Sequence, residues 1–185
     1  MKQLPNLLSF ARIALAPYIF LLLWRREYGA VLLLFGVAGI TDFLDGFLAR
    51  RWQGHSRLGA YLDPVADKIL LSGSFLVLAL SSAISTWVAA LVIGRDLAIL
   101  LFSGGVMLFS RAPRELPPSF WGKASTTAQI LFVLAVVAEL AGFMDGFAVL
   151  VHSVVVILQW IVVALTVWSG LDYGWRGIAL GRANG

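Results

Sequence analysis

Residues 41–68 read TDFLDGFLARRWQGHSRLGAYLDPVADK, a stretch that places four aspartates between two long apolar segments. The four are Asp42, Asp45, Asp63 and Asp67. An ionised carboxylate beside hydrocarbon is costly, so several in such a place indicate a functional site. They would repel one another unless a cation lay between them, and hard oxygen ligands suit Mg²⁺, Mn²⁺ or Ca²⁺. The stretch therefore predicts a divalent-metal site where two apolar helices meet.

The composition of the whole chain is too apolar for a soluble protein. Of its 185 residues, 60% are hydrophobic and 13% are charged, and the mean hydropathy is +0.89. Soluble domains average roughly 45–50% apolar and about 25% charged residues. We expect an all-α polytopic membrane protein that forms one domain over residues 1–185. The chain has no cysteine, which excludes a disulfide framework and Cys-based zinc or redox sites.

The apolar runs predict six transmembrane helices in one bundle, because a spanning helix needs roughly 20 apolar residues. We interpret the first run as a retained helix rather than a signal peptide, and its composition, unlike that of a transit peptide, favours a bacterial origin. The predicted spans are Leu7–Trp24, Ala30–Leu48, Val65–Leu80, Thr86–Phe109, Thr126–Phe143 and Phe147–Leu171.

The distribution of positive charge predicts the orientation of the bundle. The second and fourth connections and the C-terminal tail carry most of the Lys and Arg, whereas the third and fifth connections carry none; Arg25 and Arg26 in the first connection are the exception. The positive-inside rule then places both termini, and the opening of the aspartate stretch, on the cytoplasmic side of a bacterial inner membrane. Nucleic-acid binding is disfavoured, because the basic residues form no patch on a soluble domain. They are Arg50, Arg51, Arg57, Arg111, Arg114, Lys123, Arg176 and Arg182.

The end of the second predicted span has the pattern of a ligand-binding face. At about 100° per residue, Asp42, Asp45, Gly46 and Ala49 share one side of a helix. Two acids beside two very small side chains leave room for a ligand next to the metal. Arg50 follows this stripe and could reach an anionic substrate, because a guanidinium group matches phosphate oxygens in geometry and charge.

The start of the third predicted span repeats the pattern. Gly59, Asp63 and Asp67 are spaced by four residues and therefore share one stripe of a helix. We expect this helix to begin just before Pro64, since a proline is tolerated in the first turn. If the two stripes face each other, four carboxylates surround one or two divalent ions.

The combined pattern is Asp42-x2-Asp45-Gly46-x2-Ala49-Arg50-x8-Gly59-x3-Asp63-x3-Asp67. It resembles the signature of the CDP-alcohol phosphatidyltransferases at every position, and the resemblance extends from about Pro5 to about Tyr173. It implies six transmembrane helices, usually in a homodimer, with the site in a cavity open to the cytoplasm. It also implies transfer of the phosphatidyl group of CDP-diacylglycerol to an alcohol, with release of CMP.

The resemblance further implies roles for individual residues. Asp42, Asp45 and Asp63 would bind two Mg²⁺ or Mn²⁺ ions, and Asp67 would bind metal and act as the general base on the acceptor hydroxyl. The donor pocket would comprise Asp45, Gly46, Ala49, Arg50 and Gly59. The opening segment with Asn6, Ser9 and Arg12 would contribute to the headgroup cavity.

Two branches of the family differ in the acceptor, which is phosphatidylglycerol in one and glycerol 3-phosphate in the other. This chain has Arg95-Asp96, as in cardiolipin synthases, and lacks a second basic residue at position 125. Fewer cations suit an acceptor with a single negative charge, so these differences favour phosphatidylglycerol, with cardiolipin as product. Glycerol 3-phosphate remains the alternative. The residues expected to border the acceptor are Arg95, Asp96, Arg111, Arg114 and Lys123.

Two other interpretations of the aspartates remain open. An aspartate at a helix N-terminus is often only a cap, which would suit Asp63 before Pro64 taken alone. Ion-coupled transporters also use membrane carboxylates. An ion-coupled transporter does not need the Gly46-x2-Ala49-Arg50 pattern. Release of CMP would distinguish a phosphatidyltransferase from such a transporter.

Overall fold

The computed structural model describes residues 4–39, 57–109, 119–142 and 145–182, and this part of the chain consists of helices and turns with no strand. Side chains are described for residues 13–39, 68–101, 119–142 and 146–176. The helices are α1 (Leu4–Trp24), a helix over Tyr28–Gly39, α3 (Arg57–Leu80), α4 (Thr86–Phe109), α5 (Phe120–Leu140) and α6 (Ala148–Arg182), with a short 3₁₀ turn, η1 (Asp145–Phe147), before α6.

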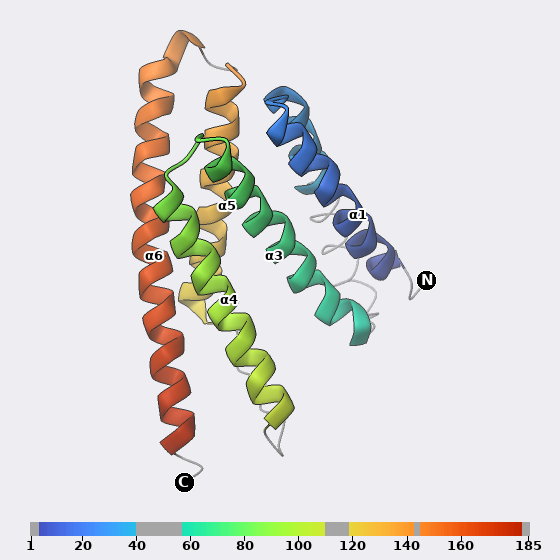
Figure 1. Cartoon of the computed structure of the whole chain (residues 1–185), viewed down its shortest axis with the longest axis vertical. Helices are drawn as coiled ribbons and strands as arrows, with labels where there is room; N and C mark the ends of the chain where they lie inside the picture. The colour runs from blue at the N-terminus through green and yellow to red at the C-terminus, as the bar shows by residue number, and fades with distance from the viewer. Residues whose placement is uncertain (1–3, 40–56, 110–118, 143–144, 183–185) are drawn as a thin grey trace.

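The helices form a bundle in which α3 is central (Figure 1). α3 packs against α1, α4 and α5, while α6 packs against α4 and α5. From α3 to α6, successive helices run in alternate directions, so the α3–α4 and α5–α6 turns lie at the upper end in Figure 1. The beginnings of α3 and α5 and the ends of α4 and α6 point toward the other end. The α3 part of the predicted site, at positions 59, 63 and 67, therefore belongs to the lower end of the bundle in Figure 1.

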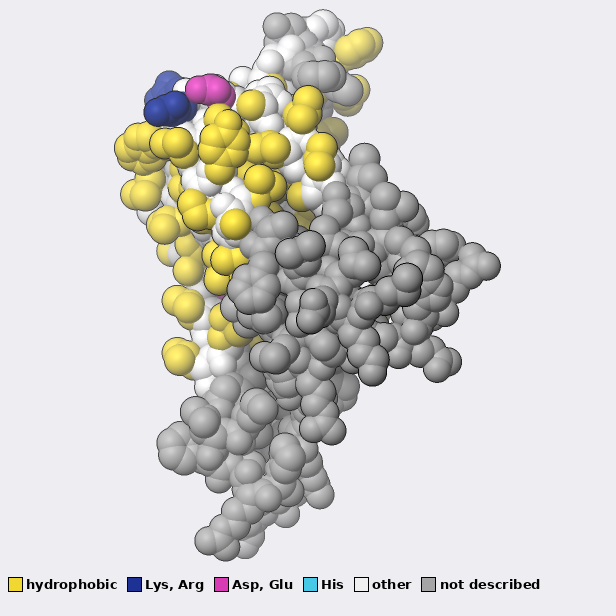
Figure 2. Space-filling view, turned by 90° about the vertical axis from the view of Figure 1, so that its right-hand side faces the viewer, with side chains coloured by type: hydrophobic (Ala, Val, Ile, Leu, Met, Phe, Trp, Pro, Cys, Tyr) yellow, Lys and Arg dark blue, Asp and Glu magenta, His cyan; other side chains and the backbone are white. Residues whose placement is uncertain are grey.

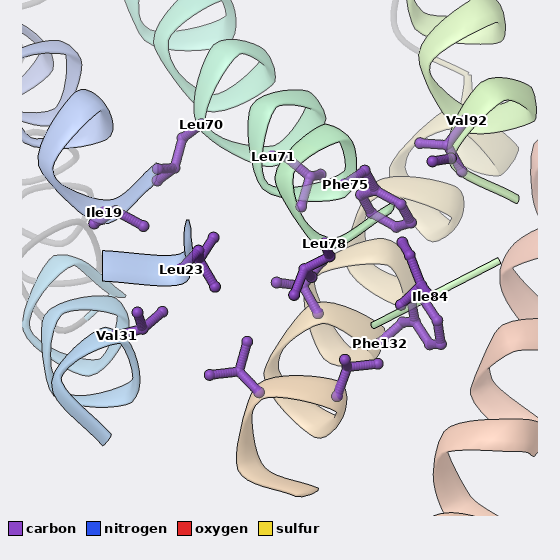
Figure 3. Close-up of a cluster of buried hydrophobic side chains, with 14 of the residues drawn as sticks. Ile19, Leu23, Val31, Leu70, Leu71, Phe75, Leu78, Ile84, Val92 and Phe132 are labelled. Atoms are coloured by element: carbon purple, nitrogen blue, oxygen red, sulfur yellow. The ribbon is translucent and has the colours of Figure 1, made fainter. Parts of the chain in front are cut away.

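A cluster of buried side chains holds the central helices together (Figure 3). The rings of Phe75 in α3 and Phe132 in α5 stack with centroids 5.8 Å apart. Aromatic pairs at this separation add about 0.5–1.5 kcal/mol beyond the area that they bury. Around them lie aliphatic side chains from α1, α3, α4 and the segments that join them, among them Ile19, Leu23, Val31, Leu70, Leu71, Leu78, Ile84 and Val92.

Gly73 lets α1 and α3 approach closely. A Cβ atom added at Gly73 would lie 2.7 Å from Cε1 and 2.8 Å from Cε2 of Phe20 in α1, and closer still to the end of the ring. Real Cβ atoms do not approach other atoms so closely, so the aromatic ring occupies the space that a side chain would need. The missing side chain of Gly73 thus fixes the packing distance of these two helices.

Both α1 and α3 end in Schellman caps whose left-handed residue is not glycine. Arg26 has φ 62° and Ser82 has φ 59°. After each of them, a backbone N–H reaches back over the last turn: Glu27 N–H donates to Leu22 C=O at 2.9 Å, and Ala83 N–H donates to Leu78 C=O at 2.8 Å. These bonds satisfy carbonyls that would otherwise lack a partner, at the cost of a backbone conformation that L-residues disfavour.

The outer surface of the bundle is strongly apolar. Figure 2 shows apolar side chains over the described part of one face, with the visible charges gathered at its upper end. In the part of the chain that was described, Phe120–Leu140 and Ala148–Arg176 are long and apolar enough to cross a membrane. Only 6% of the most apolar stretch of α6 is buried within the bundle. A helix that exposes so much apolar surface is typical of a lipid-facing helix rather than the core helix of a soluble protein.

The predicted segments are confirmed as helices wherever the structure describes them, with some different boundaries. The fourth predicted span coincides with α4 at both ends. The predicted start of the third helix is wrong, because α3 begins at Arg57 and Pro64 lies inside it. A proline there removes one backbone hydrogen bond and can bend a helix, but it has not ended this one. α5 likewise begins before its predicted start, so Lys123 lies in its first turn.

Candidate functional site

The structure describes the predicted site only in part. It brings Arg95 and Asp96 together in α4, and it places Lys123 on the exposed side of α5. Asn6, Ser9, Arg12, Gly59, Asp63 and Asp67 lie in α1 or α3, but their side chains fall outside the described set. Asp42, Asp45, Gly46, Ala49, Arg50, Arg111 and Arg114 lie outside the described residues. The meeting of the two aspartate stripes therefore stays a prediction.

The helical register of α3 relates Asp63 and Asp67 to the interior of the bundle. Positions 63, 67, 71, 74 and 78 fall on one stripe, since each step is three or four residues. Leu71, Ser74 and Leu78 on this stripe are 7%, 0% and 0% exposed. The two aspartates thus stand at helix positions that continue the buried side of α3, which suits ligands to an ion enclosed between helices.

A metal site in this protein would depend on the four aspartates. Among the side chains that the structure describes, no three His, Asp or Glu residues come together in a group able to hold a metal. Positions 63 and 67 are one helical turn apart on a continuous helix, so their carboxylates can serve neighbouring ions. Carboxylate oxygens are the ligands that Mg²⁺ and Mn²⁺ prefer, so the residues present fit such a metal.

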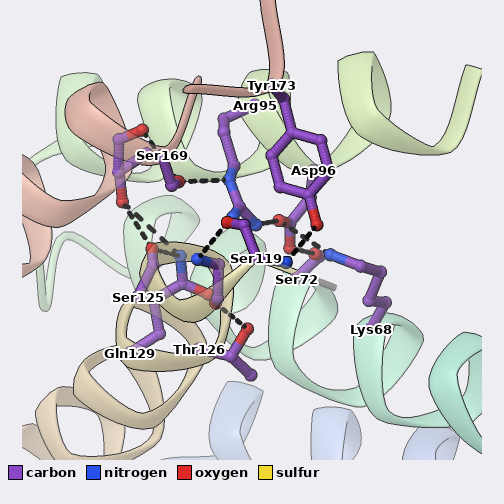
Figure 4. A network of polar contacts seen from close by, with 12 residues as sticks. Lys68, Ser72, Arg95, Asp96, Ser119, Ser125, Thr126, Gln129, Ser169 and Tyr173 are labelled. Atoms are coloured by element: carbon purple, nitrogen blue, oxygen red, sulfur yellow. Dashed lines mark hydrogen bonds and ion pairs between the residues drawn. The ribbon is translucent and has the colours of Figure 1, made fainter. Parts of the chain in front are cut away.

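Immediately after Asp67, an ion-pair cluster joins α3 to α4 (Figure 4). Lys68 Nζ lies 2.9 Å from Asp96 Oδ1, and Arg95 Nη1 donates to the same oxygen at 2.6 Å. The hydroxyl of Ser72, one turn after Lys68, donates to Asp96 Oδ2 at 3.4 Å. The single carboxylate of Asp96 therefore receives donors from two helices.

The cluster continues through Arg95 to α6 and the start of α5. Arg95 Nε donates to Ser169 Oγ at 2.9 Å, and its guanidinium carbon lies 5.9 Å from the centre of the Tyr173 ring. The Tyr173 hydroxyl accepts a hydrogen bond from the backbone N–H of Ser119 at 3.4 Å. Ser119 is also the N-cap of α5, where its Oγ accepts from the Gly122 N–H at 3.0 Å.

Burial makes this cluster costly to disrupt. Arg95 is 9% exposed and Asp96 is 3% exposed, while the Lys68 side chain is 23% exposed. Removing one partner of a buried ion pair typically costs about 3–5 kcal/mol, because the other charge is left without compensation. Arg95 and Asp96 therefore form an ion pair within α4 that also contacts α3 and α6, and their place beside the acceptor stays a prediction.

Position 125 lies in a helix interface. Ser125 is fully buried between α5 and α6. Its hydroxyl accepts from Gln129 Nε2 at 3.2 Å and lies 3.5 Å from Thr166 Oγ1 of α6. A lysine would have to insert its charged end into this helix interface. This placement weakens our inference of a less charged acceptor from position 125, and the acceptor itself stays a prediction.

The structure has two hollows on the surface of the described part of the bundle. One, of about 620 Å³, lies between α4 and α6, and its walls include the small residues Ala90, Gly94, Ala98, Gly170 and Gly174. Arg95 and Tyr173 give it a polar side. The other, of about 510 Å³, lies at the opposite end of the bundle. It contains Glu139 of α5, whose Oε1 is 2.8 Å from Nδ1 of His152 in α6.

Sequence reasoning missed the partners of Asp96 and Arg95. These partners are Lys68 and Ser72 for Asp96, and Ser169 and Tyr173 for Arg95. A signal was present, because an arginine and an aspartate inside an apolar helix require partners on neighbouring helices. Which residues on those helices would serve could be read only from the packed bundle.

Comparison with known proteins relates this chain to one family of enzymes. The model of the CDP-alcohol phosphatidyltransferase family matches residues 2–168. A CDP-diacylglycerol–glycerol-3-phosphate 3-phosphatidyltransferase of Haemophilus influenzae is 32% identical over 177 residues, covering 92% of this chain and 91% of the relative. One of Shigella flexneri is 35% identical, covering 92% of each chain. A CMP-forming cardiolipin synthase of Streptomyces coelicolor is 29% identical over 182 residues, covering 95% of this chain and 79% of the relative.

Proposed function

This chain belongs to the CDP-alcohol phosphatidyltransferase family, and on that premise we propose that it transfers the phosphatidyl group of CDP-diacylglycerol to glycerol 3-phosphate. The products are phosphatidylglycerophosphate and CMP. The observation that carries the proposal is the family match over residues 2–168, together with glycerol-3-phosphate enzymes that align over almost their whole length.

The choice of glycerol 3-phosphate replaces our expectation of phosphatidylglycerol. The bacterial glycerol-3-phosphate enzymes reach 32–35% identity with about nine-tenths of both chains aligned. The argument from position 125 no longer supports a lipid acceptor, because Ser125 is buried in a helix interface. Phosphatidylglycerol remains the second candidate, since Arg95-Asp96 resembles the cardiolipin synthases and one of these is 29% identical to this chain.

The membrane arrangement is part of the proposal. Six helices would cross the bacterial inner membrane, with both termini and the site on the cytoplasmic side. The alternating directions of α3 to α6 (Figure 1) and the positive-inside pattern of the connections support it. So do the exposed apolar side chains of α6, among them Val149 at 83% and Leu171 at 65%.

We assign metal binding to Asp42, Asp45, Asp63 and Asp67. Two Mg²⁺ or Mn²⁺ ions, when bound, would neutralise the negative charge of the donor pyrophosphate and that of the leaving CMP. The spacing of Asp63 and Asp67, one turn apart within α3, supports this assignment. Gly46, Ala49 and Gly59 would leave space for the cytidine nucleotide, and Arg50 would bind phosphate oxygens of the donor.

The remaining chemistry falls to Asp67 as general base. In the overall transfer, an acceptor oxygen becomes bonded to the phosphatidyl phosphorus, and the bond from that phosphorus to the pyrophosphate bridging oxygen breaks. CMP leaves with the bridging oxygen, and Asp67 takes the proton of the acceptor hydroxyl. Most of the catalysis of phosphoryl transfer lies in positioning and electrostatics. Asn6, Ser9, Arg12, Arg111, Arg114 and Lys123 are candidates for contact with the acceptor.

A homodimer completes the proposal. The groove between α4 and α6 has small residues on both sides, with Ala90, Gly94 and Ala98 on α4 and Gly170 and Gly174 on α6. Such residues allow the backbones of membrane helices to approach closely, so this groove would accept a helix of a second copy. The stoichiometry in detergent, measured by light scattering, tests this part independently.

The function is tested by release of CMP from the purified protein in liposomes. CDP-diacylglycerol and Mg²⁺ or Mn²⁺ are supplied with glycerol 3-phosphate or with phosphatidylglycerol in separate reactions, and the lipid products are identified. We expect release with glycerol 3-phosphate and formation of phosphatidylglycerophosphate. Release with phosphatidylglycerol alone would overturn the acceptor but keep the family chemistry. No release with either would contradict the proposal.

A further inference from the structure

A buried carboxylate in α4 binds α3 one residue after the last of the four aspartates. Asp96 Oδ1 lies 2.9 Å from Lys68 Nζ, and Asp96 Oδ2 accepts from Ser72 Oγ at 3.4 Å. Lys68 and Ser72 are four residues apart, so both contacts come from the same side of α3. Asp96 therefore holds α3 at two successive turns and opposes rotation of the helix about its axis.

The carboxylate itself is anchored to helices other than α3. Arg95 Nη1 donates to Asp96 at 2.6 Å, and Arg95 Nε donates to Ser169 in α6 at 2.9 Å. The guanidinium group also lies over the ring of Tyr173, whose hydroxyl accepts from the N-cap residue of α5. Figure 4 shows these contacts converging between four helices. Asp96 therefore cannot follow α3 if α3 turns.

We infer that Asp96 and Lys68 are positioning residues that set the rotation of α3, and thereby the placement of the carboxylates at positions 63 and 67. This inference rests on the proposed function, in which those carboxylates bind metal. A helix with side chains has a radius of about 5–6 Å, so a rotation of about 10° moves the end of a side chain by about 1 Å. An error of about 1 Å in a reacting geometry can cost about 100-fold in rate.

Charge neutralisation alone does not account for Lys68. Arg95 already supplies one positive charge to the one negative charge of Asp96, at a shorter distance than Lys68 does. The Lys68 side chain is 23% exposed and that of Asp96 is 4% exposed, so Lys68 is the less enclosed partner of this pair. What Lys68 adds is a contact between two helices. If the cluster only neutralised charge, metal binding and turnover would survive the loss of Lys68. If Lys68 positions α3, both would be weakened.

The test compares Lys68→Met with Lys68→Arg in the full-length protein in detergent. Lys68→Met keeps most of the length of the side chain and leaves the Arg95–Asp96 pair balanced, so the fold should persist. Neither Lys68 nor Asp96 is an assigned metal ligand, so the effect would come through the placement of the α3 carboxylates, where an error of about 1 Å can cost about 100-fold. We expect Lys68→Met to raise the Mn²⁺ concentration for half-maximal CMP release and to lower kcat, each by up to about that factor, and we expect Lys68→Arg to keep both near their wild-type values.

A second readout requires no turnover. Mn²⁺ without substrates should raise the unfolding temperature of the wild type, and this rise should shrink in Lys68→Met while the unfolding temperature without metal stays the same. Glu139→Gln is the matched control, because it changes a polar contact of similar length, from Glu139 Oε1 to His152 Nδ1, between α5 and α6 at the opposite end of the bundle. It should leave the Mn²⁺ response unchanged.

A double-mutant cycle shows whether Lys68 acts through Asp96. In an Asp96→Asn background, the further change Lys68→Met should raise the Mn²⁺ concentration for half-maximal CMP release by a smaller factor than it does in the wild type. Equal factors in the two backgrounds, or equal Mn²⁺ responses in wild type and Lys68→Met, would overturn the inference. Wild-type protein that responds to Mn²⁺ but releases no CMP would instead contradict the proposed function, so the two failures are distinguishable.

Discussion

The close packing of α1 on α3 predicts that Gly73→Ala destabilises the protein although alanine is the better helix former. The added Cβ would overlap three atoms of the Phe20 ring, which must then move. Overpacking of this kind typically costs about 1–3 kcal/mol. The higher helix propensity of alanine relative to glycine stabilises the helix by about 0.5–1 kcal/mol. The two ranges leave a net loss of up to about 2.5 kcal/mol, centred near 1 kcal/mol, and each kcal/mol corresponds to about 2–4 °C in the unfolding temperature of a chain of this length.

The assay is thermal unfolding in one detergent, followed by circular dichroism or by the fluorescence of a dye that reports on exposed apolar surface. Gly36→Ala is the matched control, because Gly36 is also helical and a Cβ there would meet nothing within 4 Å. It should be neutral or slightly stabilising. The double variant Gly73→Ala with Phe20→Leu should recover part of the loss, since a smaller side chain leaves room for the methyl group. If Gly73→Ala matched Gly36→Ala in stability, the argument from close packing would be refuted.

Four further predictions concern the helix cap, the packing of α5 and the site. Ser82→Gly should stabilise the protein by about 1 kcal/mol in the same assay, because glycine adopts the left-handed conformation of this cap without steric cost; an unchanged unfolding temperature would contradict this. Ser125→Lys should lower the unfolding temperature and leave the acceptor preference as it was, and a stable variant with a new preference would restore the importance of position 125. Asp67→Asn should abolish turnover while the binding of CDP-diacylglycerol persists, as measured by equilibrium dialysis of the labelled donor; substantial residual turnover would exclude Asp67 as the base. Removal of metal with EDTA should stop CMP release, and addition of Mg²⁺ or Mn²⁺ should restore it, whereas activity that survives exhaustive chelation would contradict a metal-dependent reaction.

The helical architecture could be predicted because the apolar runs are long and are interrupted by clear turn signals. The span Thr86–Phe109 was predicted at both of its ends, and the turn at Ser81–Ser85 lies where the sequence places it. The start of α3 was missed, because Pro64 was treated as a first-turn residue. One lost hydrogen bond does not end a helix whose following turns are packed against α1, α4 and α5.

The site could be predicted only to the extent that it is local in sequence. The spacing of Asp63 and Asp67 specifies a shared stripe, and α3 is helical over both positions. The partners of Asp96 could not be predicted, because Lys68 and Ser169 come from separate helices and meet only through the packing of the bundle. Position 125 shows the same limit, since nothing in the local sequence tells that Ser125 faces α6.

The central claim is that the four aspartates support transfer of a phosphatidyl group to glycerol 3-phosphate. The most direct measurement is the incorporation of radiolabelled glycerol 3-phosphate into chloroform-soluble lipid by purified protein with CDP-diacylglycerol and Mg²⁺. The wild type should form labelled phosphatidylglycerophosphate with an equal amount of CMP, and Asp63→Asn should form neither while remaining folded. Absence of labelled lipid from active wild-type preparations, or full activity in Asp63→Asn, would contradict the account.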